Sequence, residues 1–280
     1  MRQHGITALF LAAAILCAAA PSPAETLQVF VSVLPQKYFA ERVGGAGTSV
    51  SVMVGPGRSP ATYEPSPKQM VLLEDTLLYF RIGVPFEQVW MNRIAEANPE
   101  MKIVDTGRQI SSRRHDGSGE SDPHIWTSPL LADHIARTMK DAFAAADPDH
   151  RLEYERNYSR LAADLRQLDA DIRLTLASLE SRKFLVFHPS WGYFADTYGL
   201  EQIVIEKGGH APGARHLAEV IETARREKIR TVFVQEQFGR RNARAVAREA
   251  GAELVVVDPL AEDYIANLRA VTALFAEAMK

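Results

Sequence analysis

The stretch that decides the fold is "DPDHRLEYERNYSRLAADLRQLDADIRLTLASLESRK" at residues 147–183. It contains no glycine and no proline after Pro148, and apolar residues recur in it at spacings of three and four. These residues are Tyr158, Leu161, Leu165, Leu168, Ile172 and Leu179. The pattern predicts one amphipathic helix over residues 148–182, longer than most helices within a single domain. A helix of this length is expected to act as a rigid spine between the segments on either side.

The segments on both sides of the spine alternate between strand and helix patterns. Before it, the predicted strands are 27–34, 49–55, 77–83 and 102–105, and the predicted helices include one that starts at Ser66-Pro67 and one at 130–147. After it, the predicted strands are 184–187, 202–206, 231–234 and 253–257, with helices at 214–228, at 241–251 and at the C-terminus. Alternation of this kind is typical of parallel sheets.

These patterns together predict an α/β fold with two lobes. We expect the lobes at residues 25–147 and 183–280, each with a mainly parallel sheet flanked by helices, and joined by the long helix at 148–182. With a stiff connecting helix, the lobes are expected to tilt slightly during function and not to close about a wide hinge.

Residues 1–24 have the composition of a secretory signal peptide. Arg2 precedes the apolar run "ITALFLAAAILCAAA", which is too short and too rich in alanine for a membrane span. Cleavage would remove the only cysteine, so neither a disulfide nor a cysteine-ligated metal is expected. Loss of Arg2 lowers the formal net charge from −3 to −4. The dispersed, mildly acidic charge predicts no nucleic-acid partner.

Several polar residues follow predicted strands and so fall where ligands bind in open parallel sheets. His188 follows the strand "FLVF", and Asp258 follows "LVVV". Glu236 lies just beyond "TVFV", and His210 lies in the loop after "QIVIE". His124 stands directly after an Asp-Pro corner. Because these residues come from both lobes, we expect them to face one cleft.

Five motifs in order resemble a known family. They are "ATYEPSP" (61–67), "DPHIWTSP" (122–129), "HPSWGYFADTYGL" (188–200), "VFVQEQF" (232–238) and "VVVDPL" (255–260). In this order and spacing they resemble the zinc/manganese-binding periplasmic proteins of ABC importers, the ZnuA/TroA type of solute-binding protein. The similarity extends over nearly the whole chain after residue 24.

The resemblance implies one metal ion held between the lobes by three histidines and a carboxylate. Carried over by position, the second histidine corresponds to His124, the third to His188 and the carboxylate to Asp258. The first histidine of the family pattern precedes Thr-Tyr-Glu-Pro, and Ala61 stands there instead. Alanine has no ligating atom, so two nitrogens and one carboxylate remain.

The identity of the fourth ligand stays open at this point. It could be water, or His210 from the loop of the second lobe. Glu236 and Glu64 are further candidates for a substitute ligand, or for a residue that supports a ligating histidine. Zinc is expected first, manganese next, and Fe²⁺ is an alternative because two histidines and one carboxylate also describe non-haem iron sites.

The resemblance predicts a monomeric periplasmic solute-binding protein that delivers a divalent transition metal to an ABC transporter permease, without enzymatic activity. A second hypothesis keeps the fold and changes the cargo to another metal or a metal chelate, because one ligand is missing. A third hypothesis is a metallohydrolase that activates water at the open coordination position, with Glu64 or Glu236 as the base. No helix carries an H-E-x-x-H pair, which argues against this third hypothesis.

Overall fold

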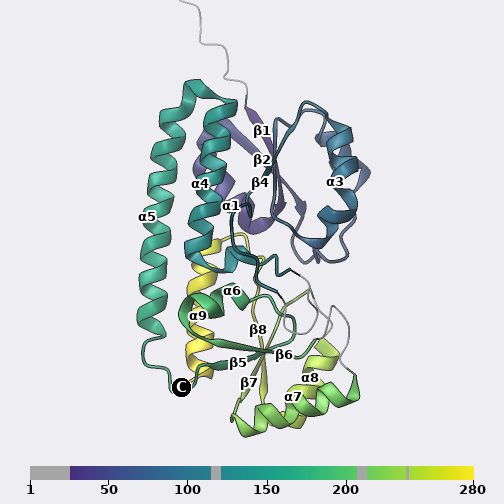
Figure 1. The fold of residues 1–280 in the computed structure, drawn as a ribbon, viewed down its shortest axis with the longest axis vertical. Coiled ribbons are helices and arrows are strands. Elements are labelled where there is room, and N and C mark those ends of the chain that lie inside the picture. Colours follow the sequence, from purple (N-terminus) through teal and green to yellow (C-terminus); the bar gives the residue numbers. More distant parts are fainter. Residues whose placement is uncertain (1–25, 115–120, 207–212, 238–239) are drawn as a thin grey trace, which may run out of the picture.

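The computed structural model describes residues 26–114, 121–206, 213–237 and 240–280. It contains two four-stranded parallel sheets flanked by helices, one in each half of the chain, with a long helix beside them (Figure 1). The predicted two-lobe α/β fold is confirmed. The predicted signal peptide lies outside the described residues, and none of the described helices is long and apolar enough to cross a membrane.

The two sheets have the same strand order. In the first sheet the order is β2-β1-β3-β4, and in the second it is β6-β5-β7-β8. The first sheet consists of β1 (Leu27–Val33), β2 (Thr48–Val54), β3 (Leu78–Arg81) and β4 (Lys102–Asp105). The second consists of β5 (Lys183–Val186), β6 (Glu201–Val204), β7 (Thr231–Val234) and β8 (Glu253–Val256). The strand order reverses at β1/β3 and at β5/β7, which are the positions where such sheets bind ligands.

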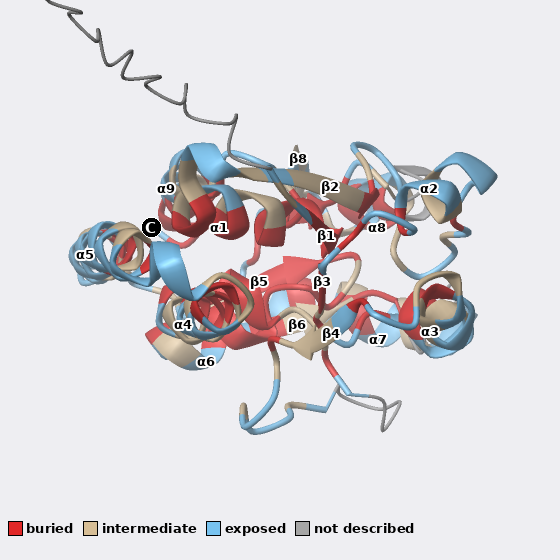
Figure 2. Ribbon diagram, turned by 90° about the horizontal axis from the view of Figure 1, so that it is seen from above, coloured by how far each residue is buried: buried red, intermediate tan, exposed pale blue. Residues whose placement is uncertain are grey.

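Helices cover both faces of each sheet. In the first lobe, α1 (Leu34–Gly44) and α4 (Pro129–Ala146) lie on one side of the strands, and α2 (Pro67–Leu72) and α3 (Pro85–Ala97) lie on the other (Figure 2). In the second lobe, α6 (Gly192–Tyr198) and α9 (Tyr264–Ala278) lie on the side of the long helix. There, α7 (Ala214–Arg226) and α8 (Arg240–Ala250) cover the opposite face around a smaller hydrophobic cluster.

The local sequence explains where several elements begin and end. The Oγ of Ser66 accepts from the backbone N–H of Gln69, so the predicted cap of α2 is confirmed. Helix α8 ends before Gly251, whose φ of 71° suits glycine. Helices α3 and α6 were not among the elements expected from sequence. The seven residues of α6 are too few for a clear periodic signal.

The long helix α5 runs from Arg151 to Thr175 and is shorter than the expected range of 148–182. A 3₁₀ turn (Pro148–His150) precedes it, and Asp147 fixes that turn by accepting from His150 Nδ1 and the Tyr154 hydroxyl. At its other end the chain turns toward β5, where the N–H of Ser181 donates to the carbonyl of Met279, the residue directly after α9. The helix packs against α1, α4 and α9, and so contacts both lobes.

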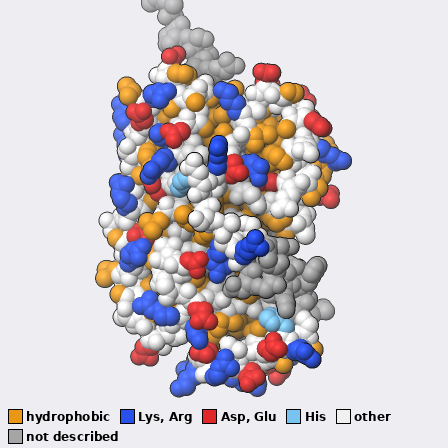
Figure 3. Space-filling view, in the orientation of Figure 1, with side chains coloured by type: hydrophobic (Ala, Val, Ile, Leu, Met, Phe, Trp, Pro, Cys, Tyr) orange, Lys and Arg blue, Asp and Glu red, His pale blue; other side chains and the backbone are white. Residues whose placement is uncertain are grey.

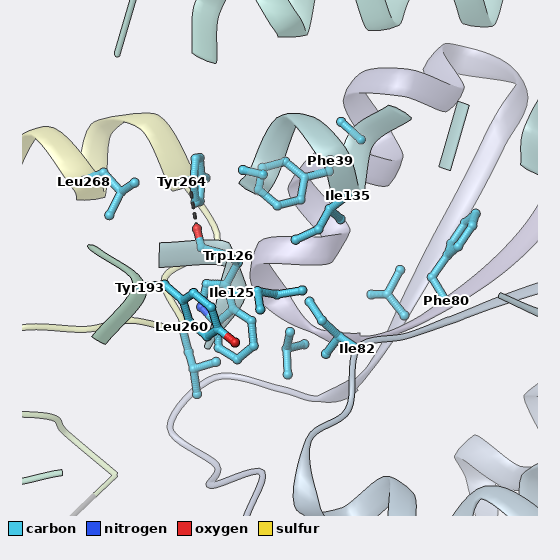
Figure 4. Close-up of a cluster of buried hydrophobic side chains, with 14 of the residues drawn as sticks. Phe39, Phe80, Ile82, Ile125, Trp126, Ile135, Tyr193, Leu260, Tyr264 and Leu268 are labelled. Carbon is cyan, nitrogen blue, oxygen red and sulfur yellow. Dashed lines mark hydrogen bonds between the residues drawn. The ribbon is translucent and has the colours of Figure 1, made fainter. Parts of the chain in front are cut away.

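The larger of the two hydrophobic clusters crosses from one lobe to the other. The 3₁₀ turn Ile125–Thr127 places Ile125 and Trp126 at its centre. Figure 4 shows these two side chains between residues of the first lobe and residues of the second. The first group includes Phe39, Phe80, Ile82 and Ile135, and the second includes Tyr193, Leu260, Tyr264 and Leu268. Because close-packed interiors resist deformation, this core supports the expectation of a small tilt between the lobes.

The surface carries charges of both signs. On the face shown in Figure 3, Lys and Arg side chains alternate with Asp and Glu side chains over both lobes. On this face, no broad area of a single sign of charge is visible that would attract a polyanion by long-range electrostatics.

Candidate metal site between the lobes

His124 is held in place by the carboxylate two residues before it. It caps the 3₁₀ turn Ile125–Thr127, and both its backbone N–H and its ring Nδ1 lie within hydrogen-bond distance of Asp122 Oδ1, at 2.9 and 2.8 Å. The Asp122 side chain is fully buried, at 0% exposure. Because an ionised carboxylate only accepts, Nδ1 is the protonated nitrogen. The lone pair of the ring is therefore on Nε2, the nitrogen that can coordinate a metal.

His188 has the same arrangement in the second lobe. It follows β5 by two residues, at the point where the strand order of this sheet reverses. Its Nδ1 lies 3.0 Å from Glu206 Oε2, and Glu206 follows the neighbouring strand β6 by two residues. The Glu206 side chain is 4% exposed and that of His188 is 18% exposed. Here too the carboxylate fixes the tautomer and leaves the lone pair on Nε2.

The two imidazoles meet between the lobes. Their ring centroids are 5.3 Å apart and their planes are inclined by 78°. Burial lowers the pKa of His188 below its ordinary value, against the opposing effect of the hydrogen bond to Glu206. The neighbouring His124 lowers this pKa further. The lowered pKa of His188 favours its neutral ring, which is the form of histidine that binds metals.

Asp258 lies on the turn after β8, which is tied to the segment that carries His124. The residue follows β8 by two positions, and its Oδ1 accepts from the backbone N–H of Leu260 at 2.9 Å and from Gln237 Nε2 at 3.2 Å. The indole N–H of Trp126, two residues after His124, donates to the carbonyl of Pro259 at 2.7 Å. This hydrogen bond ties the turn of Asp258 to the segment that carries His124.

Within the described ranges, no three His, Cys, Asp or Glu side chains lie close enough together to hold a metal ion. The structure thus brings His124 and His188 together and leaves Asp258 on the turn after β8. Of the other residues predicted from sequence, Glu64 and Glu236 are exposed, and His210 lies outside the described residues. Ala61 is exposed in the loop between β2 and α2.

Sequence reasoning missed the two carboxylates that orient the histidines. It named Glu236 as a residue that could support a ligating histidine, without saying which one, whereas Glu206 is the carboxylate beside His188. Glu236 is exposed, while its neighbour Gln235 is buried and hydrogen-bonded to Ser190 Oγ. Asp122 had a visible signal, because an Asp two residues before a candidate ligand can reach its backbone N–H. For Glu206 the only signal in the sequence was its position at the carboxyl end of a predicted strand.

We expect Glu206→Gln to lower the affinity for zinc by about tenfold, the lower end of the range for partners of metal-binding histidines. The amide can replace the carboxylate sterically, but it holds the Nδ1–H of His188 less strongly. The measurement is a competition titration with a chromophoric chelator. Glu201→Gln is the matched control, because Glu201 lies at the exposed start of β6, the strand that precedes Glu206. Equal affinities of the two variants would show that Glu206 does not support a metal ligand.

Comparisons with known proteins agree with this architecture. Residues 29–278 match the family described as "Zinc-uptake complex component A periplasmic", and the chain belongs to that family. A solved structure of ZnuA aligns with a TM-score of 0.88 at 40% identity, covering 91% of this chain and 100% of that one. A zinc-bound deletion mutant of ZnuA gives the same score and identity and is covered to 98%. The high-affinity zinc uptake system protein ZnuA of Bacillus subtilis is 25% identical over 258 residues, 86% of this chain and 81% of its own length.

Proposed function

We propose that this protein captures a zinc ion between its two lobes, with His124, His188 and Asp258 as ligands, and delivers it to the membrane permease of an ABC importer. The observation that carries the proposal is the pair of imidazoles, one from each lobe, 5.3 Å apart and each oriented by a carboxylate. A histidine that ligates a metal through one ring nitrogen generally donates the N–H of its other ring nitrogen to a carboxylate, a carbonyl or a water. The family supports the choice of cargo, because its description names zinc uptake.

Asp258 completes the proposed ligand set. Its Oδ1 is engaged by two donors, so Oδ2 is the oxygen that would meet the metal. The hydrogen bond between Trp126 and Pro259 ties this turn to the segment that carries His124. Two nitrogens and one oxygen then fill three of the four positions that zinc normally uses.

The ligand types favour zinc over manganese but do not separate it from Fe²⁺. Manganese prefers more oxygen ligands than this set offers, and Fe²⁺ accepts the same set. A metal chelate is the alternative cargo, since Ala61 leaves one position open. The comparisons do not support the metallohydrolase hypothesis, and both residues nominated as its base, Glu64 and Glu236, are exposed.

We propose that residues 1–24 direct export and are then removed, and that the remaining chain works in the periplasm. We also propose that it is a monomer. Two features support this assignment: the charged start and short apolar run of this segment, and the periplasmic description of the family. Mass spectrometry of the exported chain checks the cleavage after residue 24, and light scattering checks the monomer.

The test of the function uses the chain from residue 25 onward, which contains every described element. After removal of metal with a chelator, zinc, manganese and Fe²⁺ are titrated in competition with a chromophoric chelator. The proposal expects one zinc ion per chain, bound more tightly than manganese. A chain that binds none of these metals above the level of a heat-denatured sample would overturn it, and a metal chelate would become the next cargo to test.

A gain of affinity is expected from Ala61→His, because this change restores the family's first histidine. Ala61 is exposed, so the imidazole has room to turn toward the cleft. We expect the affinity for zinc to rise by about tenfold or more, since a direct ligand should contribute at least as much as an indirect partner. Thr62→His places the same side chain one residue away and is the control. If both variants bound zinc equally, residue 61 would not face the metal.

A further inference from the structure

Arg113 lies between the two lobes next to the proposed metal site. It belongs to the segment between β4 and the 3₁₀ turn of the first lobe, yet it contacts α6 of the second. Its backbone N–H donates to the Tyr193 hydroxyl at 2.9 Å, and its Nε donates to Asp196 Oδ2 at 3.0 Å. Its guanidinium lies over Gly192, where a Cβ would be 2.5 Å from Nη1. The arginine therefore fills a space that the second lobe keeps open for it.

The same arginine reaches the carboxylate that holds His124. Arg113 Nη1 is 3.7 Å from Asp122 Oδ2, and the backbone carbonyl of Arg113 accepts from the N–H of Asp122 at 2.8 Å. Asp122 uses its other oxygen, Oδ1, for both the backbone and the ring of His124. A buried carboxylate is held in place by the cations and donors that face it. Arg113 is one such cation, and its own side chain is only 17% exposed.

We propose that Arg113 is a positioning residue that links the lobes to the metal: held by Asp196 and Gly192 of the second lobe, it fixes Asp122 and thereby His124, and so slows the release of the bound ion. This inference rests on the proposed zinc-binding function. When the lobes tilt apart, the contacts of Arg113 with α6 break, Asp122 loses the guanidinium beside it, and His124 loses its orientation. Lobe movement and loss of a ligand are in this way coupled through one side chain.

Three variants test the link through the rate of zinc dissociation into excess chelator. Arg113→Gln removes the cation, and we expect the rate to rise about tenfold. Gly192→Ala leaves the charge in place but displaces the guanidinium, and should raise the rate by a smaller factor. Arg269→Gln is the matched control, because Arg269 makes a comparable ion pair with Asp171 at 2.9 Å, from α9 to α5, away from these residues. This control should release zinc at the wild-type rate.

A double-mutant cycle separates positioning from general stabilisation. If Arg113 acts through Asp122, then Arg113→Gln has little further effect on the dissociation rate once Asp122→Asn is present. If Arg113 merely stabilises the fold, the two effects multiply, and the inference is overturned. Melting temperatures of all variants, measured without metal, show whether any change in rate comes from partial unfolding.

Hydrogen exchange of the metal-free chain gives a readout that needs no zinc. The backbone N–H of His124 is bonded to Asp122, so Arg113→Gln should speed its exchange, while Arg269→Gln should not. If the wild-type chain binds zinc and the two variants behave alike in both measurements, the inference fails and the proposed function stands. If the wild-type chain binds no zinc, the proposed function fails together with the effect on release. If the exchange of the His124 N–H is also unchanged in Arg113→Gln, the proposal that Arg113 positions His124 fails as well.

Discussion

Replacing His188 by alanine lowers the affinity for zinc by at least about 100-fold, because loss of a ligand should exceed the 10- to 100-fold cost of losing an outer partner. The change removes the nitrogen that the second lobe contributes to the pair and leaves the buried carboxylate of Glu206 without the ring that it holds. A competition titration with a chromophoric chelator measures the loss, and the melting temperature without metal shows that the variant is folded.

His150→Ala is the matched control for this experiment. His150 also has its Nδ1 2.8 Å from a carboxylate, that of Asp147, but it lies at the start of the long helix and is half exposed. Its removal should leave the affinity for zinc unchanged. If His188→Ala and His150→Ala bound zinc equally well, the ion would not be held by the histidine pair, and the cleft would need another ligand.

Replacing Trp126 by alanine destabilises the protein by about 3–5 kcal/mol, the usual cost of truncating a large buried aromatic side chain. Trp126 is 1% exposed and lies where the cores of the two lobes join (Figure 4). The variant also leaves the carbonyl of Pro259 without its indole donor and loosens the turn of Asp258. Urea unfolding followed by far-UV circular dichroism measures the change, and a zinc titration of the folded variant should show weaker binding.

Two further variants separate the contributions of Trp126. Trp126→Phe keeps most of the apolar volume and removes the indole N–H, so about 1–3 kcal/mol should be lost for the unsatisfied buried carbonyl. Trp90→Ala truncates a half-buried tryptophan of α3 that stacks with Arg93, and should cost less than Trp126→Ala. A loss for Trp126→Ala no greater than that for Trp90→Ala would show that the lobes do not depend on this side chain.

The sequence was sufficient for the architecture because its signals are local. The stripe from Tyr158 to Ile172 predicts a helix without reference to any other part of the chain, and strands alternating with helices predict parallel sheets. The helix ends were less predictable, since the hydrogen bond from Ser181 to Met279 joins segments far apart in sequence. The two histidines could be named from the motifs around them, and the structure brings their rings together.

The residues that sequence could not assign depend on neighbours in space. Glu206 is 18 positions from His188 and reaches it only because β5 and β6 are adjacent strands. Glu236 was expected to support a histidine because it follows β7. Successive residues in extended backbone point to opposite sides, and it is Gln235 that turns inward while Glu236 faces solvent. A difference of one position at the end of a strand therefore decides which side chain is buried and which is exposed.

The hydrophobic core that the two lobes share has a consequence for how metal binding affects stability. Two lobes that share one core cannot lose their structure independently, because parting them would expose Trp126 and the aromatic and aliphatic side chains around it. We therefore expect the chain to unfold as one cooperative unit, so that an ion that binds only the folded form shifts the unfolding equilibrium of both lobes at once. We therefore expect bound metal to protect the whole polypeptide from proteolysis, including surfaces far from the cleft. The metal-bound protein should be degraded more slowly than the metal-free protein.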